Sequence, residues 1–472
     1  MSIKALGKQS LIYGFGHVLA RLVTFLLLPL YTHAFSQDEY GVISLAYAFM
    51  GLALILYRYG MDTALMKFSV QKSGSDRTSY ISTLMILQLV SSFVISFILY
   101  ALRNKIAFAV LGVNEPHWVT LLACILFLDA MWNLPLLILR TEEKPVPFVA
   151  FSLLNVGLSL GLNILFVLKF QWGVEGVLLA NVWASGVLFI FTFPIVAKRI
   201  NVRSITQPVM RAILMFGLPF LPAGILNMIM ELADRYLLAW LADTASVGLY
   251  SAGYKLGLLG LIVVTGFNMG WTPYFLKRGK EPGARLEFAH VATVFLGVLG
   301  FIISIVTIWI PEIMRIQLAG KSLIGPEFWA AEQVVGIILV AYFIHGTYII
   351  QLPGVFLKEL TSWVVGFRAV GAGVNVGLNI ILIPLYGVEG AAWATVIAQL
   401  CMSTSVWARI RNVYPVPYNI RAWIFPLLFI GFSFFINASI VQRLLVSLAY
   451  LPLWFFLALN PEEKQIVKSF LP

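Results

Sequence analysis

Apolar runs of about twenty residues recur along the whole chain, and they restrict the fold more than any other feature of the sequence. A helix needs about 20 apolar residues to cross the roughly 30 Å hydrocarbon core of a bilayer. Of the 472 residues, 60% are hydrophobic and only 11% are charged, whereas a soluble domain carries about 25% charged residues. The runs therefore predict an all-α polytopic membrane protein.

Fourteen runs are long enough to be membrane spans, although the last is short and contains proline. A stretch rich in Lys and Arg, residues 198–211, separates the sixth run from the seventh. The expected spans are 10–34, 40–60, 80–102, 117–139, 146–168, 173–197, 209–232, 247–273, 286–310, 330–357, 363–385, 387–408, 421–440 and 443–459.

The distribution of Lys and Arg predicts the orientation of these spans. With the N-terminus in the cytoplasm, 22 basic residues fall on the cytoplasmic side and 7 on the opposite side. Cytoplasmic loops carry the excess of Lys and Arg in membrane proteins. We therefore expect both termini in the cytoplasm, and we assign the net charge of +11 to membrane orientation and not to nucleic-acid binding.

Few residues suit a metal or a cofactor. Cys124 and Cys401 both lie in apolar runs, and the five His show no metal-ligand spacing. We expect no metal, no cofactor and no enzymatic activity.

The tetrapeptide Gly-Val-Glu-Gly occurs twice, at 173–176 and at 387–390, each time between two apolar runs. The two copies are 214 residues apart. A second pair of similar positions, Gly41 and Gly248, is 207 residues apart, and each of these Gly is followed six residues later by a Tyr. Six helices are therefore repeated. An even number of helices gives both repeats the same orientation, as in parallel-repeat transporters, whose substrates bind between the halves. The expected domains are an N-lobe at 1–204, a C-lobe at 205–412 and two extra helices at 413–472.

The repeated tetrapeptide itself is interpreted as structural. Gly permits unusual backbone angles in a tight turn, and Glu175 and Glu389 stand near helix starts, where the helix dipole favours a carboxylate.

Several spans carry polar residues on one face, although a charge near mid-membrane costs about 2.5–3.5 kcal/mol or more. Helices of this kind line a wet cavity, and a basic cavity suits an anionic ligand; Arg in particular binds phosphate with two parallel hydrogen bonds. The residues expected to bind substrate are His17 and Arg21 in span one, Tyr47 and Arg58 in span two, Tyr254 and Lys255 in span eight, and Arg368, Asn375 and Asn379 in span eleven, with His345 as a possible helper.

Individual charges could instead have a structural role. Arg58, Lys255 and Arg368 could extend to an interface, and Arg21 could pair with an acidic residue. Asp129, in span four, is either an ion-coupling site or the structural partner of an Arg. The cluster of Glu231, Asp234 and Arg235 is expected to be a solvated cap at the end of span seven.

The sequence NIILIPLYGVEGAAWAT, residues 379–395, resembles the polysaccharide biosynthesis (Wzx-type) flippases of the multidrug/oligosaccharidyl-lipid/polysaccharide exporter superfamily. The segments FSQDEYGVISLAYAF, residues 35–49, and ASVGLYSAGYKLG, residues 245–257, are similar to the same family. The resemblance implies a flippase of the bacterial inner membrane. It would move an undecaprenyl-diphosphate-linked oligosaccharide to the periplasmic leaflet by alternating access, for O-antigen, capsule or exopolysaccharide synthesis. A polysaccharide polymerase and chain-length machinery are possible partners.

Three other functions compete with this one. A lipid II-type flippase shares the fold and a cationic cavity. A cation-coupled multidrug exporter of the same superfamily needs acidic cavity residues, and only Asp129 is well placed for that role. A membrane glycosyltransferase or polymerase would need a large loop with catalytic carboxylates, whereas every loop here is short.

Overall fold

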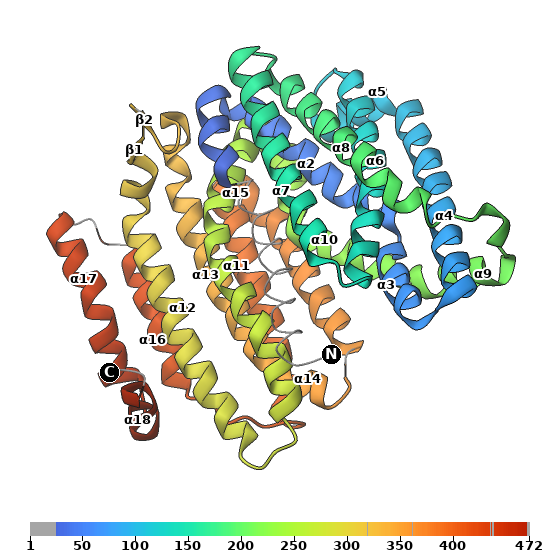
Figure 1. Cartoon of the computed structure of the whole chain (residues 1–472). Helices are drawn as coiled ribbons and strands as arrows, with labels where there is room; N and C mark the ends of the chain where they lie inside the picture. The colour runs from blue at the N-terminus through green and yellow to red at the C-terminus, as the bar shows by residue number, and fades with distance from the viewer. Residues whose placement is uncertain (1–24, 319, 361, 435, 437–438, 470–472) are drawn as a thin grey trace. The chain divides into compact units, whose positions relative to one another are not determined.

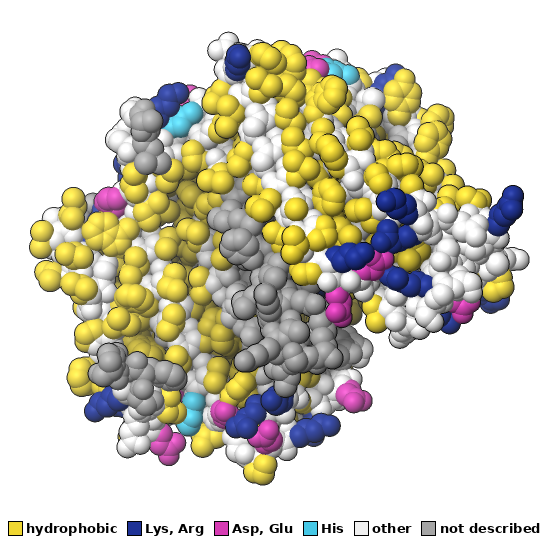
Figure 2. Space-filling model, in the orientation of Figure 1, with side chains coloured by type: hydrophobic (Ala, Val, Ile, Leu, Met, Phe, Trp, Pro, Cys, Tyr) yellow, Lys and Arg dark blue, Asp and Glu magenta, His cyan; other side chains and the backbone are white. Residues whose placement is uncertain are grey.

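The computed structural model describes residues 25–318, 320–360, 362–434, 436 and 439–469. Its contacts divide the chain into two compact units, of which unit 1 ends at Ala239 and unit 2 begins at Trp240. On the face drawn in Figure 2, hydrophobic side chains cover the flanks of the helices in each unit, and most charged side chains lie near helix ends. This distribution is the one expected of helices whose flanks face lipid.

In the described part of unit 1, the regular elements are helices joined by short turns (Figure 1). The chain enters α2 through a capping box, in which Ser36 accepts a hydrogen bond from the backbone N–H of Glu39 and the Glu39 carboxylate accepts one from the N–H of Ser36. The elements are the helix Phe25–Ala34, α2 (Gln37–Arg58), α3 (Met61–Gln71), α4 (Gly74–Ala101), α5 (Arg103–Ile106), η1 (Ala107–Leu111), α6 (Pro116–Thr141), α7 (Pro145–Asn163), η2 (Ile164–Lys169), α8 (Gly173–Ala197), η3 (Val202–Ser204), α9 (Gln207–Gly217) and α10 (Phe220–Leu241), whose last two residues pass into unit 2.

Unit 2 contains the remaining helices and one small hairpin (Figure 1). In the hairpin, Gln317 pairs with Ser322 in an antiparallel register. The elements are α11 (Thr244–Arg278), α12 (Ala284–Arg315), β1 (Gln317–Leu318), β2 (Lys321–Ser322), η4 (Pro326–Ala331), α13 (Glu332–Gln351), α14 (Pro353–Leu357), α15 (Ser362–Ile410), α16 (Ile420–Ser433), α17 (Ile440–Leu453), η5 (Trp454–Ala458) and α18 (Pro461–Ser469).

The prediction of an all-α polytopic membrane protein is confirmed. Eleven helices are long and apolar enough to cross a membrane. One of them, α15, is non-helical at Gly387 and therefore holds two spans. Two shorter apolar helices, Phe25–Ala34 and Ile420–Ser433, lie at the positions of the expected first and thirteenth spans.

Helix α13 forms the interior of unit 2, with 89% of its most apolar 18-residue stretch buried. It packs against three glycines that lie at positions i, i+4 and i+7 on one face of α11. A Cβ atom at Gly253, Gly257 or Gly260 would lie only 2.7, 2.5 or 2.9 Å from side-chain atoms of Val334, Ile338 and Tyr342, respectively. Small residues of this kind let two helix backbones approach closely inside a membrane protein.

The repeated Gly-Val-Glu-Gly segments form equivalent turns in the two units. Gly173 and Gly387 have φ angles of 58° and 54°, which side chains rarely adopt. The second glycine of each repeat packs against an earlier carbonyl: a Cβ at Gly176 would lie 3.2 Å from the Phe166 oxygen, and one at Gly390 would lie 2.3 Å from the Leu382 oxygen. The geometry agrees with the structural interpretation of this motif.

We expect Gly390→Ala to destabilise the protein by about 1–3 kcal/mol, the usual cost of overpacking. The reason is that the Leu382 carbonyl belongs to the backbone and cannot rotate away from the added methyl group. Gly377→Ala on the same helix is the matched control, because no atom lies within 4 Å of its Cβ position. Thermal unfolding in detergent measures both variants, and equal midpoints would refute the proposed contact.

Glu142, between α6 and α7, joins three segments of unit 1. Its carboxylate accepts two hydrogen bonds from Arg199, at 2.9 and 2.8 Å, one from Lys144 at 2.9 Å and one from Arg77 at 3.4 Å. Burial by itself raises the pKa of Glu142, but the hydrogen bonds and charges of Arg199 and Lys144 outweigh it and lower the pKa below its ordinary value. The ion pairs therefore favour the charged carboxylate.

A lowered pKa makes the contribution of Glu142 dependent on pH. The stabilisation is complete above the ordinary Glu pKa of about 4.3 and is lost as the pH falls through the lowered value. We expect Glu142→Gln to reduce the unfolding midpoint at pH 7 by a few degrees, about 2–4 °C per kcal/mol lost. The difference from wild type should shrink as the pH falls below about 4.3 and vanish below the lowered pKa of Glu142. Glu143→Gln, at an exposed neighbour, should have no effect at any pH in this range.

Candidate functional site

Tyr47 connects α2 to α8 within unit 1. The side-chain nitrogen of Asn181 donates a hydrogen bond to the Tyr47 hydroxyl at 3.0 Å and another to the Val177 carbonyl at 2.8 Å. Tyr47 is half-buried, so part of its ring stays accessible. A hydroxyl fixed in this way could donate its own proton to a sugar oxygen.

Arg58 ends α2 and pairs with Asp62 on the next helix. Its Nη1 lies 3.4 Å from the Asp62 carboxylate, and the Asn133 amide donates to the other carboxylate oxygen at 3.3 Å. The side chains of Arg58 and Asp62 are 32% and 30% exposed, so the ion pair is only partly buried. A stronger anion could replace Asp62 as the partner of this guanidinium.

Asp129 lies in the middle of α6 and accepts hydrogen bonds from neutral groups. Ser185 Oγ on α8 donates at 2.6 Å, and the indole nitrogen of Trp132 donates at 2.8 Å. Within the described part of the chain, Asp129 makes no salt bridge, although it lies within electrostatic range of Arg58. A role for Asp129 as the direct ion-pair partner of an Arg thus has no support among these residues.

Tyr254 is buried in the seam between α11 and α13, in unit 2. The Tyr342 hydroxyl donates a hydrogen bond to the Tyr254 hydroxyl at 3.0 Å, and the ring of Tyr250 lies one turn away, with 5.7 Å between the centroids. Lys255, the next residue of α11, is half-buried. The predicted Tyr254 therefore positions the helix that carries Lys255.

Asn375 and Asn379 lie one turn apart on α15, and both are buried. The Asn379 side chain donates to the carbonyl and to the side-chain oxygen of Asn375, at 2.9 and 3.0 Å. Asn375 in turn donates to Thr395, beyond the break at Gly387, at 3.3 Å. This chain of hydrogen bonds holds together the two halves of α15.

Arg368 is exposed on α15 and stands beside a polar group of α13. It lies within electrostatic range of His345 and Tyr348, whose rings stack with centroids 5.6 Å apart. Nδ1 of His345 lies 3.2 Å from the Gln399 side-chain oxygen. A guanidinium next to a phenol and an imidazole is well suited to bind an oxyanion.

The predicted substrate residues thus form two groups, one in each unit. Arg58, Tyr47 and the ion-coupling candidate Asp129 lie in unit 1, and Lys255, Tyr254, Arg368, Asn375 and Asn379 lie in unit 2. Arg21 and His17 fall outside the described residues. No cluster of three His, Cys, Asp or Glu that could hold a metal ion occurs in the part of the chain described here.

The prediction of a solvated cap at the end of span seven was wrong. Helix α10 continues to Leu241, so Asp234 and Arg235 lie within it, only 2% and 9% exposed. Arg235 donates to the Asp234 carboxylate at 3.1 Å and to the Glu231 carbonyl at 2.8 Å. The ion pair allows both charges to be buried; adjacent Asp and Arg inside an apolar run were the signal that could have revealed it.

Comparison with known proteins assigns this architecture to a family. The family model "polysaccharide biosynthesis protein" matches residues 6–278, more than half of the chain. The chain belongs to this family. The resemblance expected from the sequence is therefore confirmed, and this polysaccharide biosynthesis protein is a multi-pass membrane protein.

A curated relative of this polysaccharide biosynthesis protein occurs in Haemophilus influenzae. It is protein 1 of the Lsg locus, 22% identical over 328 residues, which cover 68% of this chain and 79% of the relative.

Solved structures show the same fold at low sequence identity. Lipid II flippase MurJ, in an inward closed conformation, is 14% identical with a TM-score of 0.72, covering 95% of this chain and 98% of that one. An inward-facing multidrug resistance MATE family transporter of the MOP superfamily is also 14% identical, with a TM-score of 0.68 and coverage of 89% and 96%. The polysaccharide biosynthesis protein thus has the fold of flippases and multidrug transporters.

Proposed function

We propose that this protein is a flippase that moves an undecaprenyl-diphosphate-linked oligosaccharide from the cytoplasmic to the periplasmic leaflet of a bacterial inner membrane. The observation that carries the proposal is an exposed Arg368 beside His345 and Tyr348, within a span of a polysaccharide biosynthesis protein. A charge costs about 2.5–3.5 kcal/mol or more at the centre of a span and less toward its end. A pyrophosphate offsets this cost by pairing with the guanidinium.

The proposed roles follow from the chemistry of the ligand. Arg368, Lys255 and Arg58, together with Arg21 and His17 outside the described residues, bind the pyrophosphate, whose charge would otherwise enter hydrocarbon. Tyr47 contacts sugars, whereas the buried Tyr254, Asn375 and Asn379 hold the helices that carry Lys255 and Arg368 in place. The polyprenyl tail stays in lipid. No covalent bond is made or broken.

We infer that transport proceeds by alternating access between two six-helix lobes, 1–204 and 205–412, with both termini in the cytoplasm. The positive-inside distribution supports this orientation, and Asp129 is the proposed site of ion coupling. A polysaccharide polymerase and chain-length machinery would take up the product at the periplasmic face.

A strain that lacks this gene tests the proposal. Complementation with wild type should restore surface polysaccharide, whereas Arg21→Ala should leave lipid-linked glycan in the cytoplasmic leaflet. Arg411→Ala, at an exposed loop residue, is the matched control. Normal polysaccharide with stable Arg21→Ala protein would refute the role of Arg21.

A lipid II-type flippase is the second candidate, because the lipid II flippase structure covers 95% of this chain with a TM-score of 0.72. Purified protein in liposomes separates the candidates with three cargoes: a polyprenyl-diphosphate oligosaccharide, lipid II and a cationic drug. Faster flipping of the oligosaccharide supports the first proposal. Preference for lipid II supports the second, and drug transport alone would refute both.

A further inference from the structure

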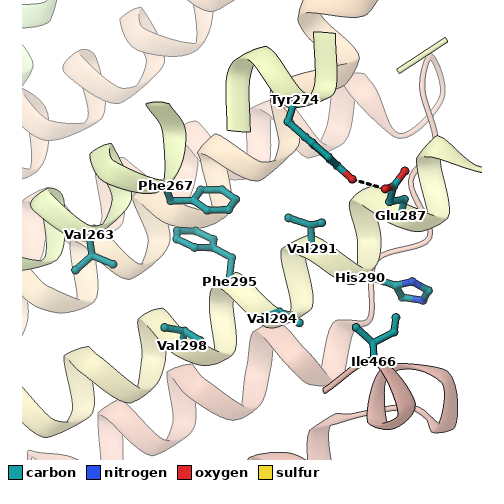
Figure 3. Close-up of a pocket in the computed structure, with 10 residues that line it drawn as sticks. All are labelled: Val263, Phe267, Tyr274, Glu287, His290, Val291, Val294, Phe295, Val298 and Ile466. Carbon is teal, nitrogen blue, oxygen red and sulfur yellow. Dashed lines mark hydrogen bonds between the residues drawn. The ribbon is translucent and has the colours of Figure 1, made fainter. Parts of the chain in front are cut away.

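A lateral pocket in unit 2 lies apart from the residues proposed to bind substrate. It has a volume of about 650 Å³, within the range of about 300–1,000 Å³ that ligand pockets show. Its lining comes from α11, α12 and Ile466 of α18 (Figure 3). Val298, at one end, is 46% exposed within a span, so the pocket opens toward lipid.

The pocket has an apolar body and a polar end. Figure 3 shows Phe267 and Phe295 stacked in its middle, with Val263 and Val298 beyond them; the two rings have centroids 3.7 Å apart. At the other end, the Tyr274 hydroxyl donates a short hydrogen bond to Glu287, and His290 lies one turn further along α12. The pocket is therefore complementary to an amphiphilic lipid: its apolar part suits an acyl chain, and its polar end suits a head group.

The length of the pocket corresponds to one leaflet. Glu287 and Val298 are separated by about 17 Å along α12, at 1.5 Å per residue, and half of the hydrocarbon core measures about 15 Å. The polar end lies near the ends of the spans, which finish at Arg278 and begin at Ala284. The pocket can therefore hold one leaflet-length acyl chain with its head group at the interface.

The charges at the polar end select the head group. Arg278 is already shared between Glu281 and Glu287, at 2.5 and 3.3 Å. Glu462 is 75% exposed on α18 and has its carboxylate 3.8 Å from His290. Among the described residues that line the pocket, Glu287 carries a carboxylate and none is Lys or Arg. A carboxylate lining favours an ammonium group that can donate hydrogen bonds.

Helix α18, which supplies Glu462 and Ile466, is firmly attached beside the pocket. Glu463 is 3% exposed and accepts hydrogen bonds from Thr293 of α12 and from Asn419, both at 2.6 Å. These hydrogen bonds hold α18, and with it Glu462 and Ile466, in a fixed position beside the pocket.

We propose that this pocket binds a membrane phospholipid with a primary ammonium head group, seating one acyl chain between α11 and α12 and the ammonium against Glu462 and Glu287. This site is separate from the proposed transport route. It makes the protein sensitive to the amine-bearing lipid of the surrounding leaflet.

Native mass spectrometry of the full-length protein, offered equal amounts of phosphatidylethanolamine, phosphatidylcholine and phosphatidylglycerol, tests the proposal. We expect about tenfold enrichment of the ethanolamine lipid, the effect of roughly one charge-assisted hydrogen bond. Val294→Trp should fill the pocket and abolish the enrichment, whereas Val90→Trp, at a lipid-exposed valine of unit 1, should preserve it.

Glu462→Gln separates the head-group contact from the chain contact. It should reduce the preference for the ethanolamine lipid without reducing total lipid retained, whereas Glu327→Gln, an exposed glutamate at the other end of unit 2, should change neither. Equal retention of the three lipids by wild type, or enrichment that persists in Val294→Trp, would overturn the proposal. A polyprenyl phosphate that displaces the ethanolamine lipid from the pocket would also overturn it.

Discussion

Arg368→Ala is expected to reduce the initial rate of oligosaccharide flipping by at least about tenfold, since a hydrogen bond to a charged group contributes about 1.5–3 kcal/mol and 1.4 kcal/mol is a factor of ten. The side chain is exposed, so its loss should leave the unfolding midpoint unchanged. Arg368→Lys keeps the charge but loses the planar fork, and an intermediate rate is expected.

The rate is measured in liposomes as the fraction of glycan that becomes protected from an impermeant glycosidase. Arg409→Ala is the matched control, because Arg409 lies on the same helix but over the Trp363 ring near the end of the span. A wild-type rate for Arg368→Ala would remove Arg368 from the substrate site. An equal loss in Arg409→Ala would show that the rate depends on charge in general.

Asp129→Asn is expected to remove the dependence of transport on a membrane gradient. A potential of 100 mV is worth about 2.3 kcal/mol per elementary charge, which corresponds to about a 40-fold change in the final distribution of cargo. Asparagine keeps a side-chain oxygen that can accept from Ser185 or Trp132, so the fold should survive. Only the ability to bind or release a cation is lost.

The measurement compares flipping with and without an ionophore. Wild type should slow when the gradient collapses, and Asp129→Asn should run at the slow rate in both conditions. Ser185→Ala removes a hydrogen bond but keeps the carboxylate, so gradient dependence should persist in this control. Gradient-dependent flipping by Asp129→Asn would leave Asp129 with a purely structural role.

The spans were predictable because a helix in lipid must be apolar over about 20 residues, whatever its neighbours are. The predicted end of span seven was wrong. The prediction ended the span at residue 232, before Asp234 and Arg235, but α10 continues to Leu241 because these two charges pair with each other. Hydropathy counts each charge separately and cannot register that pairing.

Local parts of the candidate site were predictable, and distant ones were not. Asn375 and Asn379 share a face at i, i+4, and they bond to each other. The contact of Tyr254 with Tyr342 joins residues 88 positions apart; no periodicity in either helix indicates the partner. The same holds for Ser185 and Asp129, which lie 56 positions apart.

The close packing of α11 against α13 at Gly253, Gly257 and Gly260 restricts how unit 2 can deform. The two backbones are so close that a single added Cβ would overlap Val334 or Ile338, and the hydrogen bond between Tyr342 and Tyr254 also joins these two helices. Sliding one helix past the other would force side chains into this contact. We therefore expect α11 and α13 to move as a single body, which would keep Lys255 and His345 at a constant separation.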